Sequence, residues 1–357
     1  MRDTAPLRGS QGSSRERETR QAQRPKLLFL ACYFPPVHGI ACVRTWNIAK
    51  YLVRLGWDVT VVTPDPSLWR TVEGLERVSK ELEREGIRRI LTGHRWRCLS
   101  PYDLKCWNQG LGWVLGGACR RTANELGLDR SIGWINEAER ACGFLAANQI
   151  DVILATGSPF ASFKLAKRLS DRWGCPYVLD YRDVWPNLGK SRHSERVIRT
   201  TEEALIDGSS AVVAISESLL SGKGALKSKV HVITNGFDPE EMGQIKPYDF
   251  GHFAIVYAGS FYPPQRTITP VMEALKAVKA SRIDQRIPWR FHYYGPQGDH
   301  VRAEAERFGV AQDRGAWKCH ASPGPLGHPR VWRQCRHHLC ARGKGCRGQG
   351  DRDRQII

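Results

Sequence analysis

Short apolar runs alternate with amphipathic stretches along most of the chain, starting near residue 26. The apolar runs predict buried strands at 27–33, 58–63, 151–156, 176–181, 211–215 and 230–234. Helical spacing of apolar residues predicts helices at 41–55 and 159–173, and a less regular stretch predicts helices at 71–85 and 104–126. Strands that alternate with helices indicate a parallel sheet with helical crossovers, and therefore an α/β fold.

Two of the predicted helices carry an apolar stripe along one face. We expect these stripes to face the core and not a cofactor. Their members are Val43, Trp46, Ala49 and Val53 in the first helix, and Phe160, Phe163, Ala166, Leu169 and Trp173 in the second.

The same alternation restarts after a polar segment, which we interpret as a linker at 241–252. Strands at 253–259 and 289–295 and helices at 268–280 and 300–308 predict the opening β–α–β unit of a second domain. The predicted domains are therefore 25–240 and 253–313, the second of them incomplete. Residues 1–24 lack apolar periodicity and are expected to be a disordered extension.

The formal charge of the 357-residue chain is +18, but much of it lies at the two ends. Residues 314–357 carry ten Lys or Arg and two Asp, and residues 1–24 carry six Arg and three acidic residues. We therefore expect no nucleic-acid partner for the central part. Seven of the eleven cysteines are scattered singly, which suits reduced thiols in the cytoplasm. No apolar run approaches the roughly 20 residues that a membrane span requires.

The segment from about Gly315 onward combines four cysteines and four histidines with many glycines and arginines, and it lacks an apolar pattern. Our interpretation is that 314–357 is a disordered, out-of-frame tail, and that the chain is truncated by a frameshift within its second domain. The competing interpretation is a zinc- or nucleic-acid-binding module. Its ligand spacing is irregular, so we predict no metal site. The candidate ligands of that module would be Cys319, Cys335, His337, His338, Cys340 and Cys346.

In open parallel sheets, ligands bind beyond the carboxyl ends of the strands. Gly39 and Arg44 follow the first strand, Gly157 and Ser158 follow the third, and Asn235-Gly236 follows the last strand of the first domain. Each glycine position also fits an ordinary turn, and Ser158 also fits a helix cap.

The densest group of charges is Asp180-Tyr181-Arg182-Asp183-Val184-Trp185, at the end of the strand 176–181. Two carboxylates and a guanidinium at a strand end indicate a functional site, although a structural Asp–Arg pair that braces the loop fits as well. In the second domain, Gly259, Ser260 and Arg266 precede a helix and could hold a diphosphate through backbone N–H groups and the guanidinium.

Taken together, these segments resemble family 4 glycosyltransferases, in the bacterial branch that makes surface polysaccharides and glycolipids. The resemblance covers about 26–312 and rests on YFPPVHGIACVR, DVILATGSPFAS, LDYRDVW, VITNGFDPEEM and IVYAGSFYPPQR, which occur in order.

The resemblance implies a GT-B fold, in which two Rossmann-like domains with parallel sheets face a cleft. It implies retaining transfer of a sugar from a nucleotide-sugar donor to a saccharide or lipid-linked acceptor, with no metal and no other cofactor. It also implies a cytoplasmic location, peripheral on the inner face of the membrane. Basic segments between 85 and 125 could contact headgroups there, although they fit a solvated surface equally well. The expected catalytic residues are Asp180, Arg182 and Asp183. The expected substrate-binding residues are Gly39, Arg44, Gly157, Ser158, Trp185, Asn235, Gly236, Gly259, Ser260 and Arg266.

The family's paired glutamates, eight positions apart, are expected beyond the region of resemblance, so we predict weak activity, or none, for this chain. A non-catalytic nucleotide-binding protein on the same fold is the alternative, because a fold does not determine its chemistry.

Overall fold

The computed structural model describes residues 24–37, 39–69, 72, 75–95, 117–123, 126, 131–145, 149–185, 192–220, 229–243, 249–264, 266–281, 289–311 and 317–321. The chain divides between Gly236 and Phe237 into two compact units, here called unit 1 and unit 2, and the short segment 38–40 is grouped with unit 2. The predicted boundary at residue 240 lies four residues later. Each unit is described separately.

Unit 1 is built on a seven-stranded parallel sheet with the strand order β3-β2-β1-β4-β5-β6-β7. Strand β1 lies near its centre, where Leu28 pairs with Thr60 of β2 on one side and with Ile153 of β4 on the other. The strands are β1 (Lys26–Leu30), β2 (Asp58–Pro64), β3 (Arg88–Thr92), β4 (Val152–Gly157), β5 (Tyr177–Tyr181), β6 (Ala211–Ala214) and β7 (Val230–Val232).

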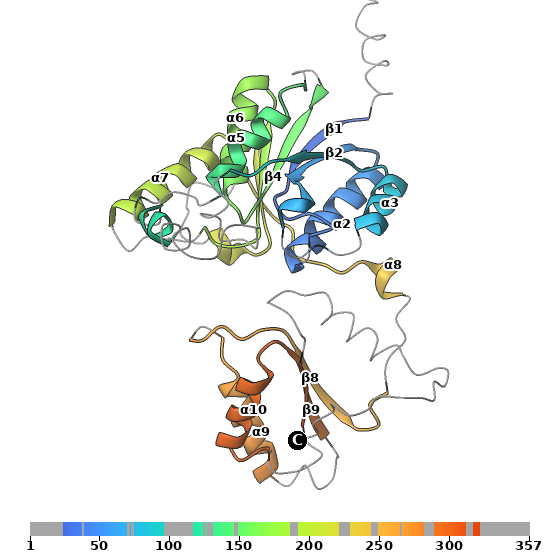
Figure 1. The fold of residues 1–357 in the computed structure, drawn as a ribbon, viewed down its shortest axis with the longest axis vertical. Helices are drawn as coiled ribbons and strands as arrows, with labels where there is room; N and C mark the ends of the chain where they lie inside the picture. The colour runs from blue at the N-terminus through green and yellow to red at the C-terminus, as the bar shows by residue number, and fades with distance from the viewer. Residues whose placement is uncertain are drawn as a thin grey trace, which may run out of the picture. The chain divides into compact units, whose positions relative to one another are not determined.

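Helices cover both faces of this sheet (Figure 1). Two of them, α2 (Ile40–Arg54) and α3 (Leu75–Glu85), pack on one face, because Trp46, Ala49 and Leu82 share a core with strand residues such as Phe29. The other face carries α5 (Ile132–Ala141), α6 (Ala161–Trp173) and α7 (Arg192–Asp207). Short 3-10 turns occupy Pro66–Leu68 and Glu217–Leu220.

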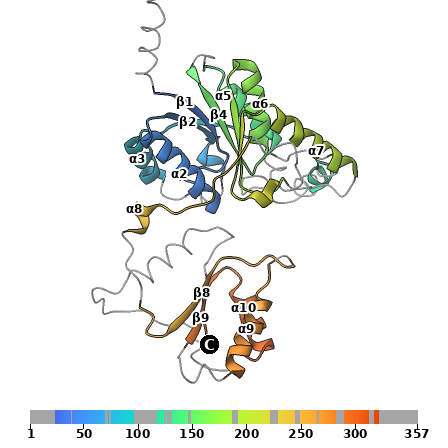
Figure 2. The ribbon, with the colours of Figure 1, turned by 180° about the vertical axis from the view of Figure 1, so that it is seen from behind.

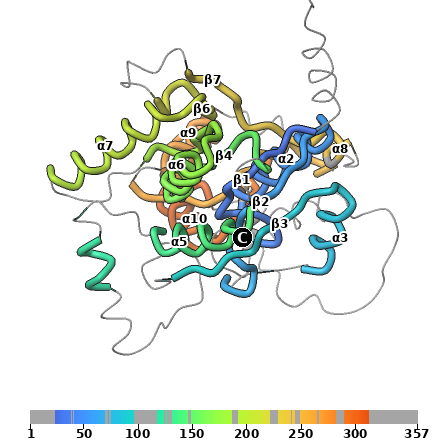
Figure 3. Tube along the Cα trace, turned by 90° about the horizontal axis from the view of Figure 1, so that it is seen from above, coloured from blue at the N-terminus to red at the C-terminus, as the bar shows by residue number. Residues whose placement is uncertain are grey.

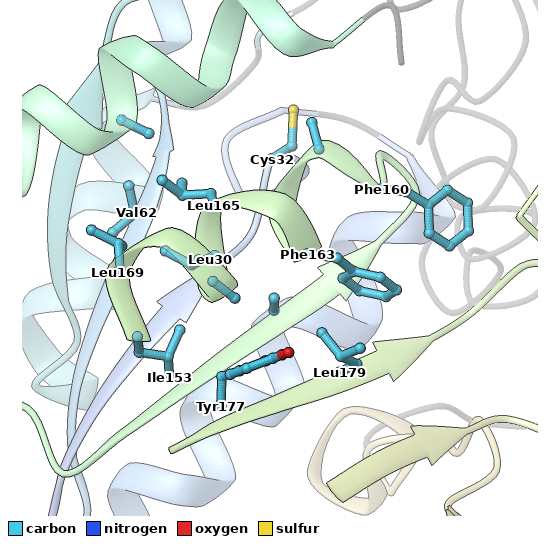
Figure 4. Packing of buried hydrophobic residues seen from close by; sticks show 14 of the residues in the cluster. Leu30, Cys32, Val62, Ile153, Phe160, Phe163, Leu165, Leu169, Tyr177 and Leu179 are labelled. Carbon is cyan, nitrogen blue, oxygen red and sulfur yellow. The ribbon is translucent and has the colours of Figure 1, made fainter. Parts of the chain in front are cut away.

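The two cores follow from the alternation of side chains along the strands. In β1, Leu27 and Phe29 point to the α2 and α3 side, whereas Leu28 and Leu30 point to the α5 and α6 side. Figure 4 shows the second of these cores, where Phe163, Leu165 and Leu169 of α6 lie over Leu30, Ile153 and Leu179 of the sheet. A strand that is buried on both faces must be apolar throughout, which explains its continuous apolar run.

Unit 2 contains a three-stranded parallel sheet with the order β10-β9-β8. Figure 2 shows strands β8 and β9 beside helices α9 and α10. Its apolar core joins β8 and β9 to α9 and α10, through Phe291 and Tyr293 of the sheet and Met272, Leu275 and Val301 of the helices. Its elements are β8 (Phe253–Ala258), α9 (Thr269–Ala280), β9 (Trp289–Gly295), α10 (Gly298–Arg307) and β10 (Trp317–Ala321). The short helix α8 (Pro239–Met242) precedes them within the segment that connects the units.

These observations confirm the α/β class and the two successive Rossmann-like units with parallel sheets. All the predicted strands are present, and 41–55, 159–173, 268–280 and 300–308 are helices with ends shifted by a few residues.

The interpretation of Val43 as a core residue is wrong, because its side chain is 48% exposed while Trp46 and Ala49 are buried. The sequence did not predict β3, α5 or α7. Among the described helices, none combines the length and the apolar character needed to cross a bilayer.

Strand β10 lies within the segment that was expected to be disordered, and it pairs in parallel with β9. Such pairing uses backbone groups, so it does not require an apolar pattern in the paired segment. The frameshift interpretation itself stays a prediction. The remainder of 314–357, almost all of 1–24, residues 104–116 of a predicted helix and most of the basic stretch 85–125 lie outside the described residues.

Candidate functional site at the carboxyl ends of the strands

The strand order of unit 1 reverses between β1 and β4, because the chain continues outward from β1 through β2 and β3 and then returns to the other side with β4. A reversal of this kind leaves a crevice beyond the carboxyl ends of the two strands. The loop after β1 leads to Gly39, and the loop after β4 begins at Gly157 and Ser158. The predicted residues on these loops therefore lie at the one edge of the sheet where ligands are expected.

Asp180 lies near the end of β5, and its side chain is 1% exposed. Its carboxylate accepts hydrogen bonds from Arg44 Nη2 at 2.7 Å and from Arg44 Nε at 3.3 Å. Thr156 Oγ1 of β4 donates a third hydrogen bond at 2.8 Å. A buried carboxylate is tolerated when it is paired and hydrogen-bonded in this way.

Arg44 comes from α2 and also contacts the segment after β7. Its Nη1 atom lies 3.3 Å from the carbonyl oxygen of Thr234 and 3.3 Å from Asn235 Oδ1. One guanidinium therefore links α2, the end of β5 and the last residues of unit 1.

Arg182 follows β5 and donates to three backbone carbonyl oxygens. Its Nε atom donates to Gly157 at 2.9 Å, Nη2 to Ser158 at 2.6 Å and Nη1 to Ala41 at 3.1 Å. The loop after β4 is thus joined to the first turn of α2 across the strand reversal. The fork of an arginine suits this task because its N–H donors are held in one plane.

Aromatic side chains form the next part of this edge. Trp185 stacks on Phe160, with ring centroids 4.5 Å apart, and meets Phe163 edge-on at 6.0 Å. Phe163 in turn contacts Tyr181 at 4.9 Å. A Cβ atom on Gly157 would lie 2.7 Å from the Phe160 ring, so the loop requires glycine there.

Asp183, Asn235 and Gly236 are exposed at the same edge. Among the described residues, none forms an ion pair with the Asp183 carboxylate. Gly39 has a φ of 147°, a backbone conformation that L side chains rarely adopt, and a Cβ atom there would meet open space. The exposed residues of this edge are therefore Asp183, Asn235 and Gly236, whereas Gly39 is partly buried.

Two titratable groups beneath the edge are neutral at physiological pH. Burial raises the pKa of the Cys42 thiol to about 12, and the charge of Arg182 opposes this shift. Burial also raises the pKa of the Tyr181 phenol, and the carboxylate of Glu202 adds to the effect. Neither group is suited to act as a base.

In unit 2, the loop after β8 carries Gly259 and Ser260. Tyr293 Oη donates to the carbonyl oxygen of Gly259 at 3.0 Å. Gln297 holds the next residue, Phe261, by accepting from its N–H at 3.2 Å and donating to its carbonyl oxygen at 3.1 Å. Arg266 is exposed, and its guanidinium lies 5.7 Å from the centre of the Tyr262 ring. A braced loop beside an exposed arginine could contact an anion.

The structure thus brings together the predicted residues of unit 1 and, separately, those of unit 2. Sequence reasoning missed the Asp180–Arg44 pair and the hydroxyl of Thr156. The positions of these residues in the sequence indicated part of this arrangement. Thr156 and Asp180 are both near strand ends, and Arg44 is in the helix after the first strand. Within the described ranges, no group of three or more His, Cys, Asp or Glu side chains could hold a metal ion.

Comparison with known proteins gives a family match for this part of the chain. The model of the glycosyl transferase 4-like domain matches residues 41–236, which is more than half of the 357 residues. No curated protein sequence matches the chain.

Three solved structures illustrate more distant similarity. The Anabaena protein Alr3699/HepE in complex with UDP-glucose is 16% identical, with 83% of this chain and 69% of that chain covered and a TM-score of 0.44. CalG4, the calicheamicin glycosyltransferase, is 12% identical, with 76% and 66% covered and a TM-score of 0.43. TarM from S. aureus, in complex with fondaparinux, alpha-GlcNAc-glycerol and UDP, is 11% identical, with 83% and 77% covered and a TM-score of 0.45.

The matched region begins one residue into α2 and ends at Gly236, so it includes Arg44, Thr156, Asp180, Arg182 and Asn235. Nearly the whole carboxyl edge of unit 1 therefore lies inside the family's domain, and the chain belongs to the glycosyl transferase 4-like family.

Proposed function

We propose that the chain transfers a sugar from a nucleotide-sugar donor to a saccharide or lipid-linked acceptor. The observation that carries this proposal is the family match over 41–236, which coincides with the polar residues gathered at the carboxyl edge of unit 1. The two parallel-sheet units are what a GT-B enzyme requires, with the acceptor bound by the first unit and the donor by the second.

On the acceptor side, the roles of the charged residues divide according to their exposure. Asp180 and Arg182 hold protein groups, so we assign them to positioning of the loops after β4 and β5. Asp183 is exposed, and it lies two residues before Trp185 in the chain. A carboxylate next to an aromatic ring is a common way to bind a sugar, because it accepts from hydroxyl groups while the ring covers an apolar face. We assign acceptor contacts to these two residues.

On the donor side, the loop of Gly259 and Ser260 would meet the diphosphate through its backbone N–H groups, and Arg266 would supply positive charge. The bond between the anomeric carbon and the phosphate oxygen breaks while the acceptor oxygen forms its bond on the same face of the sugar. The departing phosphate takes the proton of the acceptor hydroxyl, so no metal is needed to balance the leaving charge.

The test is to incubate the full chain with UDP- and GDP-sugars, with a mixture of saccharide acceptors, and with and without EDTA. Because we predict weak activity for this chain, we expect slow release of the nucleoside diphosphate, equal with and without EDTA, and a product whose anomeric configuration, measured by NMR, equals that of the donor. Saturable nucleotide binding without turnover would favour the non-catalytic alternative. An inverted product would contradict retaining transfer.

We further propose that the protein works at the cytoplasmic face of a membrane as a peripheral protein, because a lipid-linked acceptor is held there. Fractionation of cells that produce the chain tests this point. We expect the membrane-bound fraction to be released by high salt, whereas release only by detergent would contradict a peripheral contact.

A further inference from the structure

Tyr262 is an exposed aromatic residue on the loop after β8. It is 49% exposed, whereas the residue before it, Phe261, is 3% exposed and belongs to the core of unit 2. The two hydrogen bonds with Gln297 hold the backbone of Phe261. Tyr262 therefore projects into solvent from a residue that the protein anchors.

The loop closes on itself directly after Tyr262. The N–H of Tyr262 donates to the carbonyl oxygen of Arg266 at 2.9 Å, and the N–H of Arg266 donates to the carbonyl oxygen of Tyr262 at 2.9 Å. Two residues that exchange both hydrogen bonds in this antiparallel way lie directly opposite each other, so their side chains are neighbours. Accordingly, the Arg266 guanidinium lies over the Tyr262 ring, 5.7 Å from its centre.

Arg54 in unit 1 provides a comparison, because it lies at the same distance from an aromatic ring. Its guanidinium is 5.7 Å from the centre of the Tyr51 ring, but its Nε atom is also 3.0 Å from Glu85 Oε2. Arg266 is exposed and forms no ion pair with any residue that the structure describes. The ring of Tyr262 thus stands alone beside Arg266, without the carboxylate that accompanies Arg54.

The surroundings of the loop also lack a carboxylate for Arg266. Residues 250–272 contain no Asp or Glu. On the neighbouring helix α10, Glu304 accepts from Thr269 Oγ1 at 3.5 Å and pairs with Arg307 at 3.0 Å. Thr269 is the first residue of α9, which follows the loop and is labelled in Figure 3. An aromatic ring attracts a guanidinium through its face, and unlike a carboxylate it neither neutralises the charge nor occupies the N–H donors.

We infer that Tyr262 positions the Arg266 guanidinium for the diphosphate of a nucleotide-sugar donor. The inference rests on the proposed function, from which the donor is taken. A bidentate contact requires a guanidinium held in one orientation, because its fork of donors must match two phosphate oxygens. A long exposed side chain loses conformational freedom when it binds, and a ring that already restrains it reduces this cost. Tyr262 is therefore a positioning residue that acts through Arg266.

The test is an NMR titration of the full chain with UDP and with inorganic pyrophosphate, in the absence of an acceptor. Tyr262→Leu removes the ring, and Tyr262→Phe keeps it. Tyr51→Leu is the matched control, because it removes the ring that lies at the same distance from Arg54. Arg266→Ala, alone and combined with Tyr262→Leu, completes a double-mutant cycle. Hydrogen exchange at the Tyr262 and Arg266 amides shows whether each variant keeps the loop. No sugar is transferred, so a failure of the transfer assay is separate from a failure here.

We expect the wild-type chain to bind UDP and pyrophosphate, and Tyr262→Leu to bind each of them about two- to fivefold more weakly. Tyr262→Phe and Tyr51→Leu should bind both as the wild type does. In the Arg266→Ala background, Tyr262→Leu should cause no further loss, and amide exchange in the loop should not change.

Three results would overturn the inference. The first is absence of UDP and pyrophosphate binding by the wild-type chain. The second is a loss from Tyr262→Leu that persists without the Arg266 guanidinium or that Tyr51→Leu reproduces. The third is a loss that accompanies faster amide exchange at both residues, which would assign Tyr262 to the stability of the loop.

Discussion

The strand-end loops of unit 1 and unit 2 are held by different means. In unit 1, the charges of Asp180, Arg44 and Arg182 are directed inward, where each meets a protein group. In unit 2, the neutral side chains of Tyr293 and Gln297 brace the loop after β8, and the charge of Arg266 remains exposed. The difference indicates that charge near a strand end is not by itself a mark of catalysis, because a buried charge can serve as a brace.

The largest loss of stability is expected when the ion pair between Asp180 and Arg44 is removed. Asp180→Ala leaves the guanidinium of Arg44, which is 10% exposed, without its buried partner. We expect a loss of about 3–5 kcal/mol in the free energy of unfolding of unit 1, measured by urea denaturation. Asp183→Ala is the control, and because that side chain is exposed it should change the value by less than about 0.5 kcal/mol. Equal costs for the two variants would contradict the division between braced and exposed charges.

The next effect concerns pH. The folded state holds the proton of the Cys42 thiol more tightly than the unfolded state does, because burial raises its pKa from 9.0 to about 12. The contribution of the protonated Cys42 thiol to the free energy of unfolding is therefore complete below pH 9. It is lost as the pH rises toward 12, with a slope of about 1.4 kcal/mol per pH unit. Cys42→Ala should make this alkaline loss of stability shallower. Cys119→Ala, at an exposed position, should not. An unchanged slope in Cys42→Ala would refute the prediction.

Substitution of Gly157 tests whether close aromatic packing stabilises the carboxyl edge of unit 1. A methyl group at this position would lie 2.7 Å from the Phe160 ring and 3.1 Å from the Phe163 ring. Gly157→Ala should therefore lower the free energy of unfolding by about 1–3 kcal/mol. Gly236→Ala is the matched control, because a methyl group added there would have no atom within 4 Å. A cost in the control equal to that of Gly157→Ala would mean that the aromatic contact is not the cause.

The brace of unit 2 should give the smallest change in stability. Gln297→Ala removes both hydrogen bonds to Phe261, at a cost of about 1 kcal/mol. The more specific readout is hydrogen exchange, which should become faster at the Phe261 amide. Glu306→Ala, at an exposed position in helix α10, which begins directly after Gln297, should leave that rate unchanged. If the Phe261 amide exchanged equally fast in wild type and Gln297→Ala, the loop would not depend on this side chain.

Much of the fold could be predicted from the sequence, because the strands of unit 1 are buried on both faces and appear as continuous apolar runs. Strand β3 was missed since it lies at the sheet edge and carries Arg88 and Arg89. The edge of the site was also predictable, because the ends of parallel strands meet there. Which of its charged residues are buried and paired, and which are exposed, was not predictable. Asp180 and Asp183 are three residues apart, and only the contact with Arg44, 136 positions earlier in the chain, separates the buried carboxylate from the exposed one.

The most direct test of the account is the rate of sugar transfer by Asp183→Asn, measured with its unfolding free energy in the same preparation. We predict a fall of about tenfold or more in kcat/KM for the acceptor, with stability within about 0.5 kcal/mol of wild type, because the exposed Asp183 carboxylate is assigned to accept a hydrogen bond from the acceptor. Arg182→Ala should instead lose stability and activity together, since it releases three backbone carbonyl groups. Full activity of Asp183→Asn, or a loss of activity that follows only from unfolding, would contradict the assignment of the site.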